Sequence, residues 1–395
     1  MNSKNSNKEN LSGPQIAQHN DISRRTFFYR AAAPLAVTAL PQFLWAGETG
    51  SAQGVTPLTK MGIASTSFMG VELGPGQATG GARPATASGT PAQGAAGGRP
   101  RGRDAYEFLE KCHALGAGGV QTQLNGDLSK LRARAEQLGM WLEGMVSIPR
   151  NGDAAGFERS LMDAKAAGAT VVRTAMLPGR RYETFQTLAE WKKWVDESHE
   201  ALRLILPILE RQKIYLALEN HKDWTLEEMQ RLLRTYSSEY LGVCLDFGNN
   251  IALLDDPMEV IETLAPYTKS THVKDMGVRP YADGFLMSEV TLGTGFLDLP
   301  RIVSLIQKAN PKVNFSLEMI TRDPLKIPCM TPQYWTVFPE RNGKYLARTF
   351  RLVRDQSNGG PLPTVSQLSR EERAKAEEDN VKACIQYARA KQLIA

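Results

Sequence analysis

Four residues that can bind a metal ion or move a proton stand at the ends of apolar, strand-like runs in the second half of the chain. They are Glu219, Asp246, His272 and Glu318. A buried charge without a partner is costly, so three carboxylates and one imidazole in such positions indicate a shared cation. A single acidic residue there more commonly forms a salt bridge with Arg or Lys, but four in succession favour a metal site.

This ligand set is rich in oxygen and therefore suits a hard or borderline divalent cation. Mn²⁺, Mg²⁺, Co²⁺ and Zn²⁺ fit it better than copper or an iron–sulfur cluster does. The positions of the histidines agree with this interpretation. Only His221 and His272 end apolar runs, whereas His113 and His199 fall in helical patterns and His19 lies in the N-terminal segment.

Three more side chains beside these runs are candidates for binding a substrate. His221 and Lys274 can donate to substrate oxygens, or they can support the metal ligands. Trp224 can face a sugar ring, or it can pack in an aromatic core. The sequence leaves both alternatives open for each residue.

The elements that must position these residues are alternating strands and helices. Eight apolar runs predict strands: Met61–Phe68, Gly119–Leu124, Trp141–Ile148, Val171–Met176, Ile214–Asn220, Leu241–Asp246, Ser270–Lys274 and Asn314–Ile320. Amphipathic patterns between most of them predict helices, among them Asp104–Leu115, Leu128–Leu138, Ala154–Ala167, Leu188–Gln212, Leu226–Tyr236 and Leu299–Lys308.

Eight alternations of strand and helix over about 260 residues are typical of the α/β class with a (β/α)8, or TIM, barrel. A doubly wound open sheet is the alternative fold. The barrel is favoured because no glycine-rich dinucleotide-binding turn follows the first run. The C-terminal ends of barrel strands form the active-site face, which is where the four candidate ligands would lie.

The sequence of residues 1–52 is typical of an export signal. Arg24 and Arg25 precede the apolar run Ala31–Ala46, the order of a twin-arginine signal peptide. A membrane anchor is the alternative, but these 16 residues include two prolines and fall short of the ~20 that a spanning helix needs. We therefore expect a signal peptide at residues 1–52, the twin-arginine export machinery as a partner, no stable membrane anchor, and a periplasmic or secreted protein.

Residues 53–395 are predicted to form the barrel with two additions. Gly70–Arg103 contains ten glycines and four prolines and hardly any large apolar residue, so it cannot form a core of its own. It is either an insertion without a role or a mobile cover over the active site. At the other end, Ser369–Lys391 predicts a last helix that completes the outer ring.

Composition excludes several kinds of protein. The chain has 395 residues, of which 42% are hydrophobic and 23% charged, so a sizeable core is expected rather than a fibrous or disordered chain. The net charge of +5 is too small to suggest nucleic acid or an anionic membrane as a partner. Four scattered cysteines show no CxxC spacing. A small molecule is the expected partner, and the oligomeric state stays open.

Five motifs resemble the xylose-isomerase-like TIM-barrel superfamily, the sugar phosphate isomerase/epimerase group. In order they are Glu-Asn-His, Asp-x-Gly-Asn, His-Val-Lys-Asp, Gly-x-Gly-x-x-Asp-Leu and a terminal Glu, between Met61 and Glu318. The resemblance implies a divalent metal bound by the four residues named above. Two positions depart from ketose 3-epimerases: Asn249 replaces a histidine, and Thr294 replaces a glutamate often found there. Asn249 is thereby a further candidate for binding substrate.

The resemblance also implies a reaction. The metal would polarise a ketone, while Glu219 and Glu318 remove the neighbouring proton and return it through an enediolate. This describes a sugar isomerase or epimerase. A lyase or hydrolase of 3-keto-glycosides would use the same site, and a noncatalytic sugar-binding barrel is the third alternative. Export favours substrates without phosphate, a sugar or a glycoside.

Overall fold

The computed structural model describes residues 58–69, 104–150, 152–357 and 361–394. These residues belong to the unit Gln53–Ala395. The predicted signal peptide at 1–52 and the predicted insertion at 70–103 lie outside the described residues, so both stay predictions.

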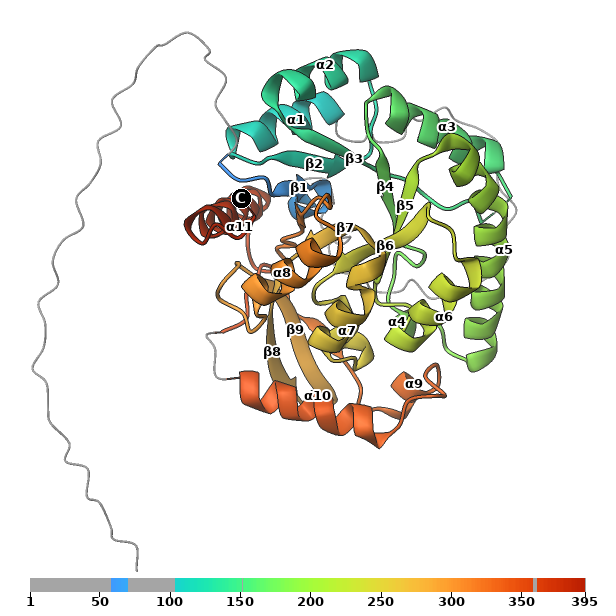
Figure 1. Ribbon diagram of the computed structural model, residues 1–395. Helices are drawn as coiled ribbons and strands as arrows, with labels where there is room; N and C mark the ends of the chain where they lie inside the picture. Colours follow the sequence, from blue (N-terminus) through green and yellow to red (C-terminus); the bar gives the residue numbers. More distant parts are fainter. Residues whose placement is uncertain (1–57, 70–103, 151, 358–360, 395) are drawn as a thin grey trace, which may run out of the picture. The chain divides into compact units, whose positions relative to one another are not determined.

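Eight parallel strands close into a barrel (Figure 1), and their order around it is β1-β10-β7-β6-β5-β4-β3-β2. Their bounds are β1 Gly62–Ala64, β2 Gly119–Thr122, β3 Trp141–Met145, β4 Val171–Thr174, β5 Tyr215–Glu219, β6 Leu241–Asp246, β7 Thr268–Val273 and β10 Ser316–Leu317. Each overlaps one of the predicted runs. Because β1 pairs with β10, the sheet has no open edge, and the TIM-barrel prediction is confirmed.

Helices alternate with these strands, as the amphipathic patterns predict. The expected ones are α1 Ala105–Ala114, α2 Leu128–Leu138, α3 Ala154–Ala166, α5 Leu188–Gln212, α6 Leu226–Tyr236 and α8 Leu299–Ala309. Elements that the sequence analysis did not single out are α4 Arg181–Thr184, α7 Pro257–Leu264, α9 Pro332–Trp335, α10 Gly343–Gln356, and the 3-10 turns η1 Ser65–Phe68, η2 Asn249–Leu253 and η3 Ala265–Tyr267.

The predicted last helix is present as α11, Arg370–Ala390. It begins at a capping box in which Ser369 and Glu372 satisfy each other's backbone N–H groups. Its apolar side buries Val381 and Ile385 in the hydrophobic core. The helix lies on the outside of the barrel (Figure 1) and contacts η1, which follows β1.

A small antiparallel sheet is attached to the barrel and was not predicted. It consists of β8 Asp275–Tyr281, β9 Gly284–Val290 and β11 Leu325–Ile327, in the order β11-β9-β8. The hairpin β8–β9 leaves the barrel directly after β7, and β11 joins it from the segment after β10. The sheet therefore extends the active-site end of these two barrel strands.

Within the described part of the chain, no helix combines the length and the apolar character needed to cross a membrane.

Candidate metal centre

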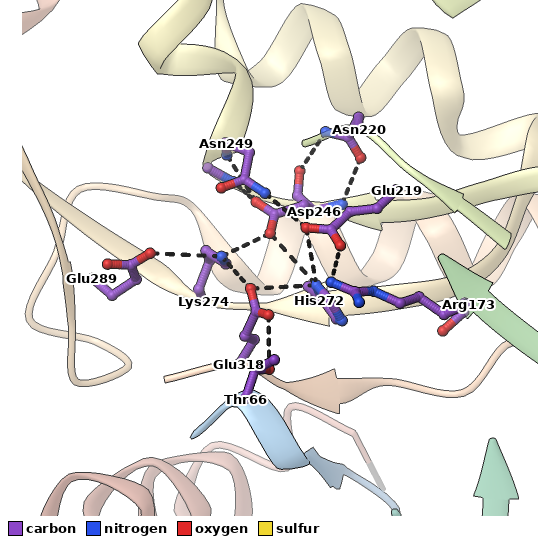
Figure 2. A network of polar contacts seen from close by, with 12 residues as sticks. Thr66, Arg173, Glu219, Asn220, Asp246, Asn249, His272, Lys274, Glu289 and Glu318 are labelled. Carbon is purple, nitrogen blue, oxygen red and sulfur yellow. Dashed lines mark hydrogen bonds and ion pairs between the residues drawn. The ribbon is translucent and has the colours of Figure 1, made fainter. Parts of the chain in front are cut away.

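The four candidate ligands converge at the C-terminal ends of neighbouring strands. Asp246 on β6 is in register with His272 on β7, and His272 is in register with Ser316 on β10, two residues before Glu318. Glu219 ends β5, which pairs with β6. All four side chains are buried, and Figure 2 shows the three carboxylates around the His272 ring.

The distances fit a single small cation. From His272 Nδ1, the carboxylate oxygens of Glu318, Glu219 and Asp246 lie at 3.3, 3.5 and 3.7 Å. One ligand atom from each of the four residues lies within 4.8 Å of every other. Two ligands held by bonds of ~2.1 Å are at most about 4.2 Å apart. The three imidazole–carboxylate distances meet this limit, so one ion can bridge the imidazole to each carboxylate, and any pair of ligands near 4.8 Å would draw closer when the ion binds.

A buried chain of hydrogen bonds fixes the orientation of the His272 ring. The amide nitrogen of Gln121 donates to Glu143 Oε2 at 3.1 Å and to Ser270 Oγ at 3.0 Å. Its amide oxygen therefore faces His272 Nε2, at 2.7 Å. Because that oxygen can only accept a hydrogen bond, Nε2 must carry the proton and donate it. The lone pair of His272 Nδ1 is left pointing at the carboxylates.

This arrangement calls for a positive charge at Nδ1. The atom is buried and has no hydrogen-bond partner among the described residues. Although burial lowers the pKa of His272, nearby negative charges, including those of Glu318 and Glu219, raise it well above its ordinary value. A lone pair facing three carboxylates is stable only with a proton or a metal ion between them, so the residues present fit a divalent cation.

Glu219 is held from two sides. Arg173 on β4 donates to its Oε2 in a buried ion pair, and the Asn249 amide donates to its Oε1 at 3.0 Å. Burial raises the pKa of Glu219, but the charges of Arg173 and His272 outweigh burial and lower the pKa. The carboxyl is consequently ionised.

Glu318 and Asp246 share the ammonium group of Lys274. Its Nζ lies 2.6 Å from Glu318 Oε2 and 2.7 Å from Asp246 Oδ2. Thr66 donates to the other Glu318 oxygen at 2.8 Å. Burial raises the pKa of Glu318, but the charges of His272 and Lys274 hold it well below its ordinary value. Lys274 thus touches two of the four candidate ligands.

The other candidate substrate residues lie in different surroundings. Asn249 contacts Glu219, as described. His221 is half-buried and its Nδ1 is buried without a hydrogen-bond partner among the described residues. Burial, followed by the charge of Lys222, lowers its pKa to about 4. Trp224 packs against the rings of Trp191 and Trp194, with centroids 5.5 and 5.1 Å away. These contacts favour aromatic packing over sugar stacking for Trp224.

The glycine motif shapes a loop beside the site. The Asp275 carboxylate accepts hydrogen bonds from the backbone N–H groups of Gly293, Gly295 and Leu297. Gly293 has φ +84°, and a Cβ there would collide with the ring of Tyr387, which explains a glycine at this position.

Sequence reasoning missed several polar residues of the site, namely Gln121, Arg173, Lys222, Glu289 and Arg322. Gln121 and Arg173 interrupt the apolar runs of β2 and β4, which is a signal in itself. A polar residue inside a barrel strand is costly to bury without a partner.

The family match agrees with the geometry. The sequence model described as "Xylose isomerase-like TIM barrel" matches residues 109–337. The 3-oxo-isoapionate decarboxylase of Pectobacterium atrosepticum is 31% identical over 222 residues, which cover 53% of this chain and 76% of that enzyme.

Solved structures with a similar fold are more distant. A xylose isomerase domain protein from Planctomyces limnophilus aligns with a TM-score of 0.42 and 16% identity, over 62% of this chain and 91% of that one. A xylose isomerase-like TIM barrel protein from Mycobacterium smegmatis, crystallised with magnesium, gives 0.41 and 17%, over 63% and 89%. The matched residues 109–337 contain all four candidate ligands, and the chain belongs to the xylose isomerase-like TIM barrel family.

Proposed function

We propose that this protein is a divalent-metal-dependent sugar isomerase or epimerase, which removes the proton next to a ketone and proceeds through an enediolate. The observation that carries the proposal is the placement of Glu219 and Glu318. Their carboxylates come from β5 and β10 and approach His272 Nδ1 to 3.5 and 3.3 Å. Two ionised carboxylates on either side of one cation site are suited to removing a proton and returning it.

Each carboxylate has partners that keep it ionised and oriented. Arg173 and Asn249 hold Glu219, while Lys274 and Thr66 hold Glu318. When bound, the metal supplies a Lewis acid that polarises the ketone. One carboxylate accepts the α-proton. The enediolate is then reprotonated by that same carboxyl group, or by the other carboxylate after it has taken up a proton from solvent. Lys274 can stabilise negative charge that develops on a substrate oxygen.

A second reaction is favoured by the sequence relative. The relative is 31% identical and is named as a decarboxylase of 3-oxo-isoapionate. Loss of CO₂ from a 3-oxo acid leaves the electrons of the broken C–C bond on the substrate as an enolate, which then takes up a proton. This step needs the same stabilisation of negative charge as epimerisation, so decarboxylation of a keto sugar acid is the second candidate.

One experiment separates these reactions. Metal-loaded protein is incubated in D₂O with keto sugars, 3-keto-glycosides or keto sugar acids, and the products are followed by NMR. Deuterium uptake with a new epimer or isomer supports the proposal, release of CO₂ supports decarboxylation, and release of the aglycone supports a lyase. No exchange with any substrate contradicts the proposal and favours a noncatalytic barrel. Glu197→Gln, at an exposed helix carboxylate, is the control variant.

A further inference from the structure

Three cationic side chains, two of them buried and one partly exposed, lie beside the metal centre and have few carboxylates to balance them. Lys222 and Lys274 are 3% and 1% exposed, and the Arg322 side chain is 21% exposed. Outside the four candidate metal ligands, one carboxylate faces this group in the described part of the chain, that of Glu289. Its oxygens bind Arg322 at 2.6 Å and lie 3.8 Å from Lys274 Nζ.

Lys222 is the least balanced of the three. Its ammonium donates to the amide oxygen of Asn249, a neutral group, and it forms no ion pair with a carboxylate among the described residues. Burial and the charges of Arg322 and Lys274 together lower its pKa to about 8. It therefore remains mostly charged at neutral pH, and a buried charge without a counter-ion is costly.

The position of this group connects it to the reaction. Lys222 follows β5 by three residues, and Arg322 follows β10 by five, so both lie past strand ends, at the active-site face. Asn249 links Lys222 to the site directly, because its amide nitrogen donates to Glu219 Oε1 at 3.0 Å. A substrate group that contacts Lys222 would thus lie close to a candidate catalytic carboxylate.

The balance of positive and negative side-chain charges around the site indicates the charge of the substrate. Glu219, Asp246 and Glu318 are the carboxylates assigned to the metal ion. A divalent ion offsets two of these three negative charges, and Arg173, which is paired with Glu219, offsets the third. Glu289 is then left to balance Lys222, Lys274 and Arg322. We propose that the missing negative charge is a carboxylate of the substrate, which makes the substrate a keto sugar acid rather than a neutral keto sugar. This inference rests on the proposed function and narrows its substrate class.

The test measures binding rather than turnover. D-Gluconate, D-glucitol and D-glucitol 6-phosphate share a six-carbon polyol chain and differ in the charged group. Each is titrated calorimetrically into wild-type protein, Lys222→Met and the control Lys193→Met, which removes a lysine that is 79% exposed. Titrations with and without Mn²⁺ separate binding to the side chains from direct ligation of the metal.

We expect wild-type protein to bind gluconate at least ~10-fold more tightly than glucitol, as a charge-assisted hydrogen bond allows. The preference should be lost in Lys222→Met and kept in Lys193→Met. Methionine is apolar and of similar length, so it suits a buried position; if it still prevents folding, Arg322→Gln replaces it in the same comparison.

Three outcomes overturn the inference. The first is that the wild type shows no preference for gluconate over glucitol, which includes the case in which no probe binds. The second is a preference that Lys222→Met leaves unchanged, and the third is tighter binding of glucitol 6-phosphate than of gluconate. The last would assign the cations to a phosphorylated substrate. None of these outcomes contradicts the proposed function, because deuterium exchange with the three substrate classes in D₂O, charged and neutral, tests the reaction separately.

Discussion

A single nitrogen lone pair decides whether the cluster of carboxylates can take up a metal ion. His272 presents Nδ1 to Glu219, Asp246 and Glu318 only because Gln121 occupies its other nitrogen. Gln121 cannot reverse its amide, since its nitrogen is engaged by Glu143 and Ser270. The ligand set is thus prepared by a residue that does not touch the ion site.

Gln121→Met should weaken metal binding by ~10- to 100-fold, the usual effect of losing a partner that orients a metal ligand. Titration with Co²⁺ or Zn²⁺ measures the affinity, and ¹⁵N spectra of the Zn²⁺-loaded wild type should show the His272 proton on Nε2. Gln137→Met, at an exposed position of helix α2, should change neither. A proton found on Nδ1 in the loaded wild type would contradict the assignment.

Glu318→Gln keeps the size of the side chain and one ligand oxygen but removes the charge and the ability to accept a proton. If Glu318 is both ligand and base, metal affinity should fall modestly, while turnover falls ~10²- to 10⁴-fold, as is typical of losing a positioned base. Turnover is measured against metal concentration.

The Glu318→Gln measurement has two other possible results. Full recovery of turnover at saturating metal would remove Glu318 from the catalytic residues and leave it as a ligand. Lost stability with unchanged turnover per folded molecule would make it a structural carboxylate.

At the scale of elements, the small sheet β8-β9-β11 brings charged residues to the active-site end of the barrel. Glu289 lies on β9 and reaches Arg322, which precedes β11. Asp275 begins β8 and binds three backbone N–H groups of the loop that precedes α8. The sheet and this loop are therefore coupled through one buried carboxylate.

Asp275→Asn should destabilise the protein, because both carboxylate oxygens accept backbone N–H bonds and asparagine offers only one acceptor. A buried N–H left without a partner costs ~1–3 kcal/mol, which urea unfolding can measure. Asp298→Asn is the matched control: Asp298 caps α8, and asparagine caps helices as well as aspartate does. Equal stability of Asp275→Asn and the wild type would contradict the role given to Asp275.

At the scale of the whole molecule, the closed barrel lets side chains on β5, β6 and β7 and just after β10 meet at one point. Residues 1–52 carry the sequence features of an export signal, and we propose that the protein is translocated by the twin-arginine pathway. That pathway carries folded proteins, so the metal could be bound in the cytoplasm before export.

The export proposal is tested with residues 1–52 fused to a reporter protein. Arg24→Lys combined with Arg25→Lys should abolish export while leaving synthesis unchanged, because the pathway reads the arginine pair. The measurement is the fraction of reporter in the periplasm. Lys8→Arg in the same fusion, which leaves the arginine pair intact, is the control. Export that persists in the double variant would remove the twin-arginine assignment.

Much of the fold and the centre of the site follow from local sequence patterns. The spacing of apolar residues along the chain is a local property, so the barrel strands and the main helices could be predicted from it. β1 and β10 are shorter than the apolar runs that predicted them. The C-terminal ends of barrel strands meet at one face by geometry. Glu219, Asp246, His272 and Glu318 could therefore be grouped before any contact was known.

Tertiary structure alone decided which partners surround these four residues. Gln121 meets His272 from 151 positions away, and Arg173 meets Glu219 from 46. Such contacts depend on barrel closure and strand register, which no local period encodes. The hairpin β8–β9 was missed for a related reason: it continues from β7 without an intervening helix, and its pairing with β11 is set by residues that follow β10. The sequence by itself determined the barrel and the types of the candidate ligands, whereas the burial of Lys222 and the direction of the His272 lone pair exist only in the folded chain.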